Sequence, residues 1–418
     1  MDFNKLINNN GMYFYKDDSF NTISASFCFK GKVGNRENAI YDFLCNYLLK
    51  SNSIYNSEEL DKKRKELYNI GLSVSSSLTG KQRILTFHID MVSPSVVEDD
   101  YSKEAFKFAK ERFFSPDFTR DDNLEMLKKE RISSFKASLS SPSVKAKNLY
   151  NSMVYNNPDM EYEYSTDIKY MEDLINSITL EEMKQLYEET INNENFYRGL
   201  MFGNATLNDF NEFKKNFPFN SKLANLDFDT KESIKDGVIV VPNEDTNESI
   251  VYQTYNIDSS NRGIRMILRD IYSGSSDLCL YVLRNKHGLV YNASTILYPF
   301  SDKFVVKACV DKNNIDKLIE ATDELISISQ DEKQIKPMLE RAKESIRNDD
   351  YIMSEDRDDV VYELTSHIRG MFPEFNHDEF MDKLDEVKEE DVTSVTKTLK
   401  RKSIFVYRGD AKWETIRK

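Results

Sequence analysis

The chain has 418 residues, of which 39% are hydrophobic and 12% aromatic, so it can bury sizeable cores and wholesale disorder is excluded. Lys and Arg number 57 against 71 Asp and Glu, and the formal net charge of −14 argues against a main role in binding nucleic acid or an anionic membrane. The four cysteines have no CxxC spacing, and neither a signal peptide nor a membrane-length apolar run is recognised. We therefore expect a cytoplasmic protein with reduced thiols that binds neither nucleic acid nor membrane.

The first half of the chain mixes strand and helix signals. Alternating apolar residues predict strands at 21–31, 72–78, 84–91 and 197–202, and Thr79-Gly80 between the middle two is typical of a hairpin. Apolar residues at helical spacing predict helices at 36–49, 58–68, 103–113, 121–139, 144–155 and 181–191.

The same kind of pattern restarts after Gly203. Residues 210–236 are polar and irregular, and we interpret them as the connection between two halves. Strands are then predicted at 237–241, 249–255, 289–297, 304–310 and 404–407. Helices are predicted at 263–272, 277–286, 314–328, 333–348, 358–369 and 390–399.

The two halves end alike. Gly203 closes an apolar strand 21 residues after Glu182, and Gly409 closes another 19 residues after Glu390. The shared order of strands, helices and a closing strand indicates a duplication. We predict an α+β protein of two homologous α/β sandwich domains, each a mostly antiparallel sheet with helices packed on one face. The predicted domains span 1–208 and 237–418, joined by a linker at 209–236.

Residue types alone reveal little catalytic chemistry. The chain has no P-loop, no GxGxxG and no GxSxG motif. Its runs of carboxylates are interpreted as solvated helix caps and faces, as expected for an acidic chain. Its four histidines lack the spacing of a zinc site and are interpreted as isolated residues: His88, His287, His367 and His377.

The most informative segment is 278–294, LCLYVLRNKHGLVYNAS. A helix is predicted to end near Gly288 and a strand to follow, so Arg284 in the last helical turn and Tyr291 on the strand can aim at one spot. A guanidinium and a phenol there can hold a peptide carbonyl or a developing oxyanion. Alternatively, Arg284 neutralises the helix C-terminus and Tyr291 fills the sheet face.

Residues 273–294 resemble the C-terminal-half signature of the insulinase/pitrilysin family, which includes the mitochondrial-processing-peptidase type. That signature reads roughly GGxxSxLxxxxREKxGLxYxxxS, and it corresponds here to Gly274, Ser276, Leu280, Arg284, Lys286, Gly288, Leu289, Tyr291 and Ser294. The resemblance implies two homologous α+β domains, often paired with a second chain to enclose a chamber. Active members carry an HxxEH motif on the first long helix, where two His and a distal Glu hold zinc and the Glu of the motif activates water.

The zinc motif is absent from the N-terminal half. Aligned with the family pattern, the ligand positions fall on Asp42 and Asn46 and the water-activating position on Cys45, and no His lies between residues 1 and 87. The distal Glu would lie in the helix at 121–139, which offers Glu125 and Glu130. A weaker metal site on Asp42, Cys45 and Asn46 is an alternative, although Asn is a poor zinc ligand. We expect no metal or other cofactor in this chain, and zinc in a partner subunit.

Arg284 and Tyr291 correspond to family residues that contact substrate across the chamber. A chain that keeps this pair without zinc ligands resembles inactive bacterial homologues that accompany an HxxEH-bearing neighbour, some of which mature ribosomally made peptides. The resemblance thus predicts a non-catalytic subunit of a heterodimeric zinc metallopeptidase, partnered by a homologous HxxEH-bearing subunit and a peptide substrate. Two alternatives stay open: a scaffold or peptide-binding protein that uses the edge of strand 72–78, and an independent enzyme built on Cys45 and His88.

Overall fold

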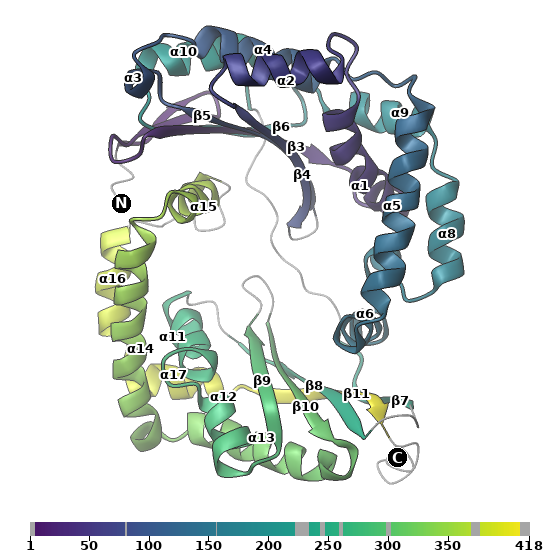
Figure 1. The fold of residues 1–418 in the computed structure, drawn as a ribbon. Coiled ribbons are helices and arrows are strands. Elements are labelled where there is room, and N and C mark those ends of the chain that lie inside the picture. The colour runs from purple at the N-terminus through teal and green to yellow at the C-terminus, as the bar shows by residue number, and fades with distance from the viewer. Residues whose placement is uncertain are drawn as a thin grey trace. The chain divides into compact units, whose positions relative to one another are not determined.

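The computed structural model describes residues 5–79, 82–155, 157–221, 234–242, 247–258, 262–297, 302–368 and 377–409 (Figure 1). Gly80 of the predicted hairpin, residues 222–233 of the predicted linker, Arg369 and Asp410 lie outside the described residues. The chain divides into unit 1, of Met1–Ser138, Asp159–Phe228 and Asp356–Phe375, and unit 2, of Leu139–Pro158, Asp229–Glu355 and Asn376–Lys418. None of the described helices combines the length and apolar character needed to span a membrane.

Unit 1 is built on a six-stranded sheet, sheet A, with the order β1-β2-β6-β3-β5-β4. Its strands are β1 (Ile7–Asn9), β2 (Met12–Lys16), β3 (Thr22–Gly31), β4 (Gly71–Thr79), β5 (Gln82–Val92) and β6 (Phe196–Gly203). The helices mainly in this unit are α1 (Asn35–Lys50), α2 (Ser57–Glu66), α3 (Pro94–Val97), α4 (Ser102–Phe114), α5 (Asp121–Leu139), η2 (Pro158–Met160), α7 (Glu161–Tyr164), α8 (Ile168–Asn176), α9 (Leu180–Thr190), α10 (Leu207–Asn216) and α15 (Arg357–Ile368).

Unit 2 is built on a five-stranded sheet, sheet B, with the order β7-β11-β8-β10-β9. Its strands are β7 (Gly237–Pro242), β8 (Glu248–Asn256), β9 (Val290–Leu297), β10 (Lys303–Asp311) and β11 (Lys400–Gly409). Its helices are α6 (Pro142–Tyr155), α11 (Arg262–Ser273), α12 (Leu278–Leu280), η3 (Tyr281–Lys286), η4 (Lys312–Asn314), α13 (Ile315–Ser329), α14 (Glu332–Met353), α16 (His377–Glu386) and α17 (Glu389–Thr396).

The two sheets repeat one topology. Sheet B has the order β7-β11-β8-β10-β9, and sheet A shows the same order in β2-β6-β3-β5-β4, with β1 added at its edge. Each contains one parallel pair, β2 with β6 and β7 with β11, while the other pairs are antiparallel. The predicted α+β class and the duplicated, mostly antiparallel sheets are therefore confirmed.

Each sheet buries its main core on one face and receives one helix on the other. In sheet A, Phe27 stacks on Phe87 and contacts the tilted ring of Phe217 just after α10, whereas α15 packs on the opposite face against Leu200 and Phe202 (Figure 1). In sheet B, α6 packs against the face that carries Tyr252, Val305 and Phe405, opposite the main core of unit 2. We call the side of sheet A that contacts α15 the α15 face.

Several elements differ from the sequence predictions. Residues 209–216, assigned to the irregular connection, belong to helix α10, because Thr206 and Asp209 make a capping box and Phe210 and Phe213 are buried. The short strand β2 and the helices α8 and α16 have no counterpart among the predicted elements. The predicted helix 277–286 begins as α12 and continues as a π-helix, η3.

Candidate functional site

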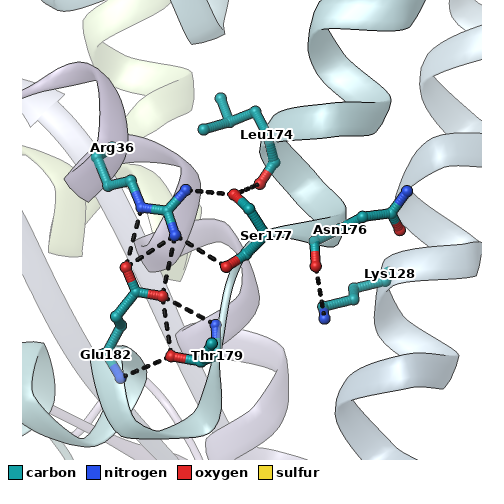
Figure 2. Close-up of polar contacts among 7 residues, drawn as sticks. All are labelled: Arg36, Lys128, Leu174, Asn176, Ser177, Thr179 and Glu182. Carbon is teal, nitrogen blue, oxygen red and sulfur yellow. Dashed lines mark hydrogen bonds and ion pairs between the residues drawn. The ribbon is translucent and has the colours of Figure 1, made fainter.

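Helix α1 carries the aligned zinc-motif positions, and Arg36 anchors its N-terminal turn. The guanidinium donates from Nη2 to both carboxylate oxygens of Glu182, at 2.8 and 2.9 Å, and to the Ser177 carbonyl oxygen at 3.0 Å (Figure 2). Glu182 also accepts hydrogen bonds from Thr179, with which it forms the capping box of α9. These bonds fix the start of α1 to the turn between α8 and α9.

Asp42 lies in a closed group with Arg131 and Tyr162. Arg131 Nη2 of α5 is 3.0 Å from Asp42 Oδ2, and the Tyr162 hydroxyl of α7 donates to the same oxygen at 2.5 Å. Arg131 Nε donates to the Tyr162 hydroxyl at 2.9 Å. Burial, and then the charge of Asp42, raise the pKa of Tyr162, so the phenol keeps its proton and remains a donor.

Cys45 and Asn46 offer little to a metal. Cys45 is only 8% exposed, and burial, with the charge of Asp42 as a second cause, raises the pKa of its thiol to about 12. The thiolate that binds metals is therefore scarce at neutral pH. Asn46 is exposed, and its Nδ2 donates to the backbone carbonyl oxygen of Asp42 at 3.1 Å.

The acidic residues predicted on α5 have other partners. Glu125 forms an ion pair with Lys128 at 2.8 Å, and Glu130 forms one with Lys50 at 3.2 Å. In the part of the chain that the structure describes, no group of three His, Cys, Asp or Glu side chains could hold a metal ion. The residues at the aligned positions thus do not fit zinc, because a guanidinium already neutralises the one carboxylate among them.

A segment that the sequence did not single out covers this side of α1. The Tyr162 amide donates to Asn35 Oδ1 at 2.5 Å, and Asn38 Nδ2 donates to the Asp159 carbonyl oxygen at 2.9 Å. Together with Asp42, these contacts fasten η2 and α7 along three positions of α1 that share one helical face.

Arg284 is positioned by an irregular helix. It lies in η3, where the His287 amide donates to the Val282 carbonyl oxygen five residues earlier at 3.2 Å. Such π-turns are rare in proteins, and those that occur often lie at functional sites. The Arg284 side chain is exposed, and its guanidinium lies over the ring of Tyr291, 5.1 Å from the centroid.

Tyr291 is positioned by an irregular strand. The register of β9 on β10 shifts between the pairs Ala293–Ala308 and Val290–Val310, so Tyr291 and Asn292 lie opposite the single residue Cys309. This β-bulge turns Tyr291 outward, and 85% of its side chain is exposed. Tyr291 therefore does not fill the sheet face, which was the alternative left open for it.

The neighbouring Lys286 has a carboxylate partner, whereas the described residues offer none to Arg284. Lys286 and His287 both contact the carboxylate of Glu324, and hydrogen bonds from Lys286, and then from His287, hold the pKa of Glu324 below its ordinary value. Among the described residues Arg284 has no carboxylate partner, and the ring of Tyr291 is its side-chain contact. The pair thus presents an uncompensated guanidinium and a phenol to solvent, both of which can donate to a carbonyl oxygen.

The structure brings some of the predicted site residues together and leaves others apart. Arg284 and Tyr291 are in contact, and Asp42 and Asn46 share a hydrogen bond. Glu125 and Glu130 instead pair with lysines. Arg131 and Tyr162, which decide the chemistry around Asp42, were not predicted, because no local spacing marks two residues that meet only through the fold.

Comparison with solved structures identifies the fold. Neither a family model nor a curated protein matches this sequence. A conserved protein from Enterococcus faecalis V583 is 16% identical with a TM-score of 0.77, and the match covers 96% of this chain and 97% of that one. A peptidase M16 inactive domain from Pseudomonas fluorescens is 15% identical with a TM-score of 0.72, over 96% of this chain and 95% of that one. A protease from Helicobacter pylori is 15% identical with a TM-score of 0.69, over 96% of this chain and 98% of that one. The chain therefore shares, over nearly its whole length, the fold of these proteins, one of them described as an inactive peptidase domain.

Proposed function

We propose that this chain is a non-catalytic, peptidase-like subunit that positions a peptide for a zinc-bearing homologous partner. Arg284 and Tyr291 are the residues that contact the peptide, and the partner, with an HxxEH motif, supplies the zinc chemistry. The chain itself acts in the cytoplasm and holds no metal. The fold that it shares with an inactive peptidase domain supports this proposal.

The observation that carries the proposal is the backbone that holds Arg284 and Tyr291. Arg284 lies in a π-helix and Tyr291 lies in a β-bulge, and both side chains are exposed. A purely structural pair would gain more from burial, since about 25 cal/mol of hydrophobic stabilisation is lost per Å² of apolar surface left in water. Irregular backbone that exposes two donors is typical of a site that binds a ligand.

The pair suits an extended peptide. A peptide carbonyl offers two lone pairs, and a guanidinium and a phenol can donate to them from two directions. The Tyr291 ring beneath Arg284 limits the motion of the guanidinium, so less entropy is lost when the peptide binds. A partner's active site would then receive a peptide in a fixed orientation.

A scaffold or peptide-binding protein without a catalytic role is the second candidate, and sheet A gives it a specific surface. Strand β4 is the last strand of the sheet, and Ser73, Ser75 and Ser77 are exposed along it. An edge strand can pair with an extended peptide through its unpaired backbone groups. This candidate predicts peptide binding without cleavage in any pairing.

The test is reconstitution. This chain, an HxxEH-bearing homologue from the same genome, and their mixture are each assayed with zinc on quenched fluorescent peptides. The proposal predicts cleavage only by the mixture, or cleavage at least tenfold faster than by the homologue alone. If the homologue cleaves equally well without this chain, the catalytic part of the proposal fails, and a peptide-binding assay then decides for or against the second candidate.

A further inference from the structure

Two cations lie side by side on the α15 face of sheet A, outside the regions discussed above. Lys30 of β3 is on this face because it alternates with Phe29, which is buried on the opposite side. Arg198 of β6 pairs with Cys28 of β3 and shares its face. Leu200, two residues further along β6, already contacts α15. The two cations thus lie just beyond the surface that the helix covers.

A β-bulge forms this cluster. The register of β3 on β6 shifts between the pairs Cys28–Arg198 and Phe29–Phe196, so Tyr197 is the extra residue. The bulge lets the Tyr197 ring lie beneath both cations, with Arg198 4.9 Å and Lys30 5.6 Å from its centroid. Bulges of this kind re-aim side chains next to binding sites.

The described residues do not compensate the charge of the cluster. Neither Lys30 nor Arg198 forms an ion pair with a carboxylate in the described part of the chain. Burial, and then the charge of Arg198, lower the pKa of Lys30, and no carboxylate raises it. Arg198 Nε is buried without a hydrogen-bond partner, although Nη1 donates to the Tyr197 carbonyl oxygen at 2.8 Å and to the Ser221 hydroxyl at 2.5 Å. An anion bound here would offset the repulsion between the two like charges and could accept from the unpaired Arg198 Nε.

We propose that Lys30 and Arg198 bind an anionic group on the α15 face of sheet A, and that this group is a carboxylate of a bound peptide. The inference rests on the proposed function, because a peptide-positioning subunit brings acidic side chains or a C-terminus to such a surface. A guanidinium held by Tyr197 and Ser221 suits a carboxylate, and the flexible lysine adds a second charge. A phosphoryl group is also an anion that accepts hydrogen bonds from a guanidinium and an ammonium. The experiment must therefore distinguish phosphate from a peptide carboxylate.

The test measures binding to the full-length chain alone. Fluorescence anisotropy compares a labelled tetraglutamate amide with the matching tetraglutamine amide, and inorganic phosphate serves as competitor. Because the chain carries a net charge of −14, long-range electrostatics disfavour the acidic peptide, so a preference for it requires a local cationic site. We expect tetraglutamate to bind at least tenfold more tightly than tetraglutamine.

Variants assign the site. Lys30→Met and Arg198→Met should each weaken tetraglutamate binding about tenfold, as expected for a lost charged contact, while Arg198→Lys should keep part of it. Lys32→Gln is the matched control, since Lys32 is two residues away and is already paired with Glu189 at 2.5 Å. The thermal midpoint of each variant checks that it folds. If Arg198→Met does not fold, Lys30→Met alone still tests the inference.

Each outcome decides the matter. Equal binding of the two peptides, or an unchanged affinity in Lys30→Met, would overturn the inference, and binding of phosphate without tetraglutamate would overturn the assignment to a peptide. Competition between phosphate and tetraglutamate supports one shared anion site. If the reconstituted pair cleaves peptides but the chain shows no acidic preference, this inference fails while the proposed function stands. If tetraglutamate binds and its binding needs Lys30, but no mixture cleaves peptides, this inference stands while the catalytic part of the proposed function fails.

Discussion

Arg131 Nη2 lies 3.0 Å from Asp42 Oδ2, so a fixed guanidinium stands beside the α1 position where the family resemblance would place a zinc ligand. Tyr162 closes the group by donating to the same oxygen. The contact joins α1, α5 and α7 through one carboxylate. A cation that belongs to the protein thus balances the charge of the Asp42 carboxylate.

The first prediction concerns the strength of this contact. Arg131→Ala should lower the free energy of unfolding by about 1–2 kcal/mol, because it removes a charged hydrogen bond and leaves Tyr162 with one partner fewer. The value is modest because the side chains of Arg131 and Asp42 are 34% and 45% exposed. Urea unfolding of Arg131→Ala, Asp42→Asn and the double variant gives the coupling, expected to be about 0.5–1 kcal/mol. Strictly additive effects would show that the two residues do not interact.

The second prediction is that Arg131 itself opposes metal binding. Asp42→His with Asn46→His places two imidazoles at i and i+4 on exposed positions of α1, which is a zinc-ligand spacing. Calorimetric titration with zinc should show at least tenfold tighter binding when Arg131→Glu is added, since a repelling charge becomes a ligand. Arg131→Gln in the same background separates the loss of charge from the gain of a ligand. Equal zinc affinity with Arg131 retained would contradict the account.

The third prediction concerns the acid dependence of stability at the Arg36–Glu182 pair. Although burial acts to raise it, hydrogen bonds from Arg36 and then Thr179 hold the pKa of Glu182 below its ordinary value. A depressed carboxyl pKa contributes stability that is fully present above the unfolded value of about 4.3 and is lost as pH falls through the folded value. Glu182→Gln keeps the capping box and should lose about 0.5–1 kcal/mol at pH 7, with the difference shrinking towards pH 3.

The neighbouring residue offers a control for that measurement. Glu181→Gln removes the same charge from the same helical turn, where Glu181 is exposed. It should change the free energy of unfolding by less than about 0.5 kcal/mol. A Glu182→Gln difference that persists unchanged at pH 3 would mean that the carboxylate charge is not what Arg36 stabilises.

The fourth prediction tests the alternative of an independent enzyme built on Cys45. With a thiol pKa of about 12 and 8% exposure, Cys45 should react with iodoacetamide at pH 7.5 at least about 100-fold more slowly than a free cysteine. Among the described residues, the His88 side chain makes its polar contacts with Ser24 and Asp90. Rapid alkylation of Cys45, seen by mass spectrometry and accompanied by loss of a measured activity, would revive this alternative.

Much of the fold could be predicted because its signals are local. The period of apolar residues marks α1 and α5, and the alternation along β3 marks a strand. Helix α10 was missed because its ten residues are largely polar, and only the capping box at Thr206 and the buried pair of phenylalanines reveal it. Arg284 and Tyr291 could be predicted together because they lie seven residues apart, on a helix and on the strand that follows it. Arg131 and Tyr162 could not, since each lies far from Asp42 in sequence and meets it only through the packing of three helices.

The most direct test of the central claim is the turnover of the reconstituted mixture with Arg284→Ala. The account predicts that kcat/KM falls about tenfold or more while the two chains still associate, because the guanidinium contacts the peptide. Tyr291→Phe should lose less, and Lys286→Ala should match wild type, since Glu324 already neutralises that lysine. Unchanged turnover in Arg284→Ala, with the complex intact, would contradict the role assigned to this pair.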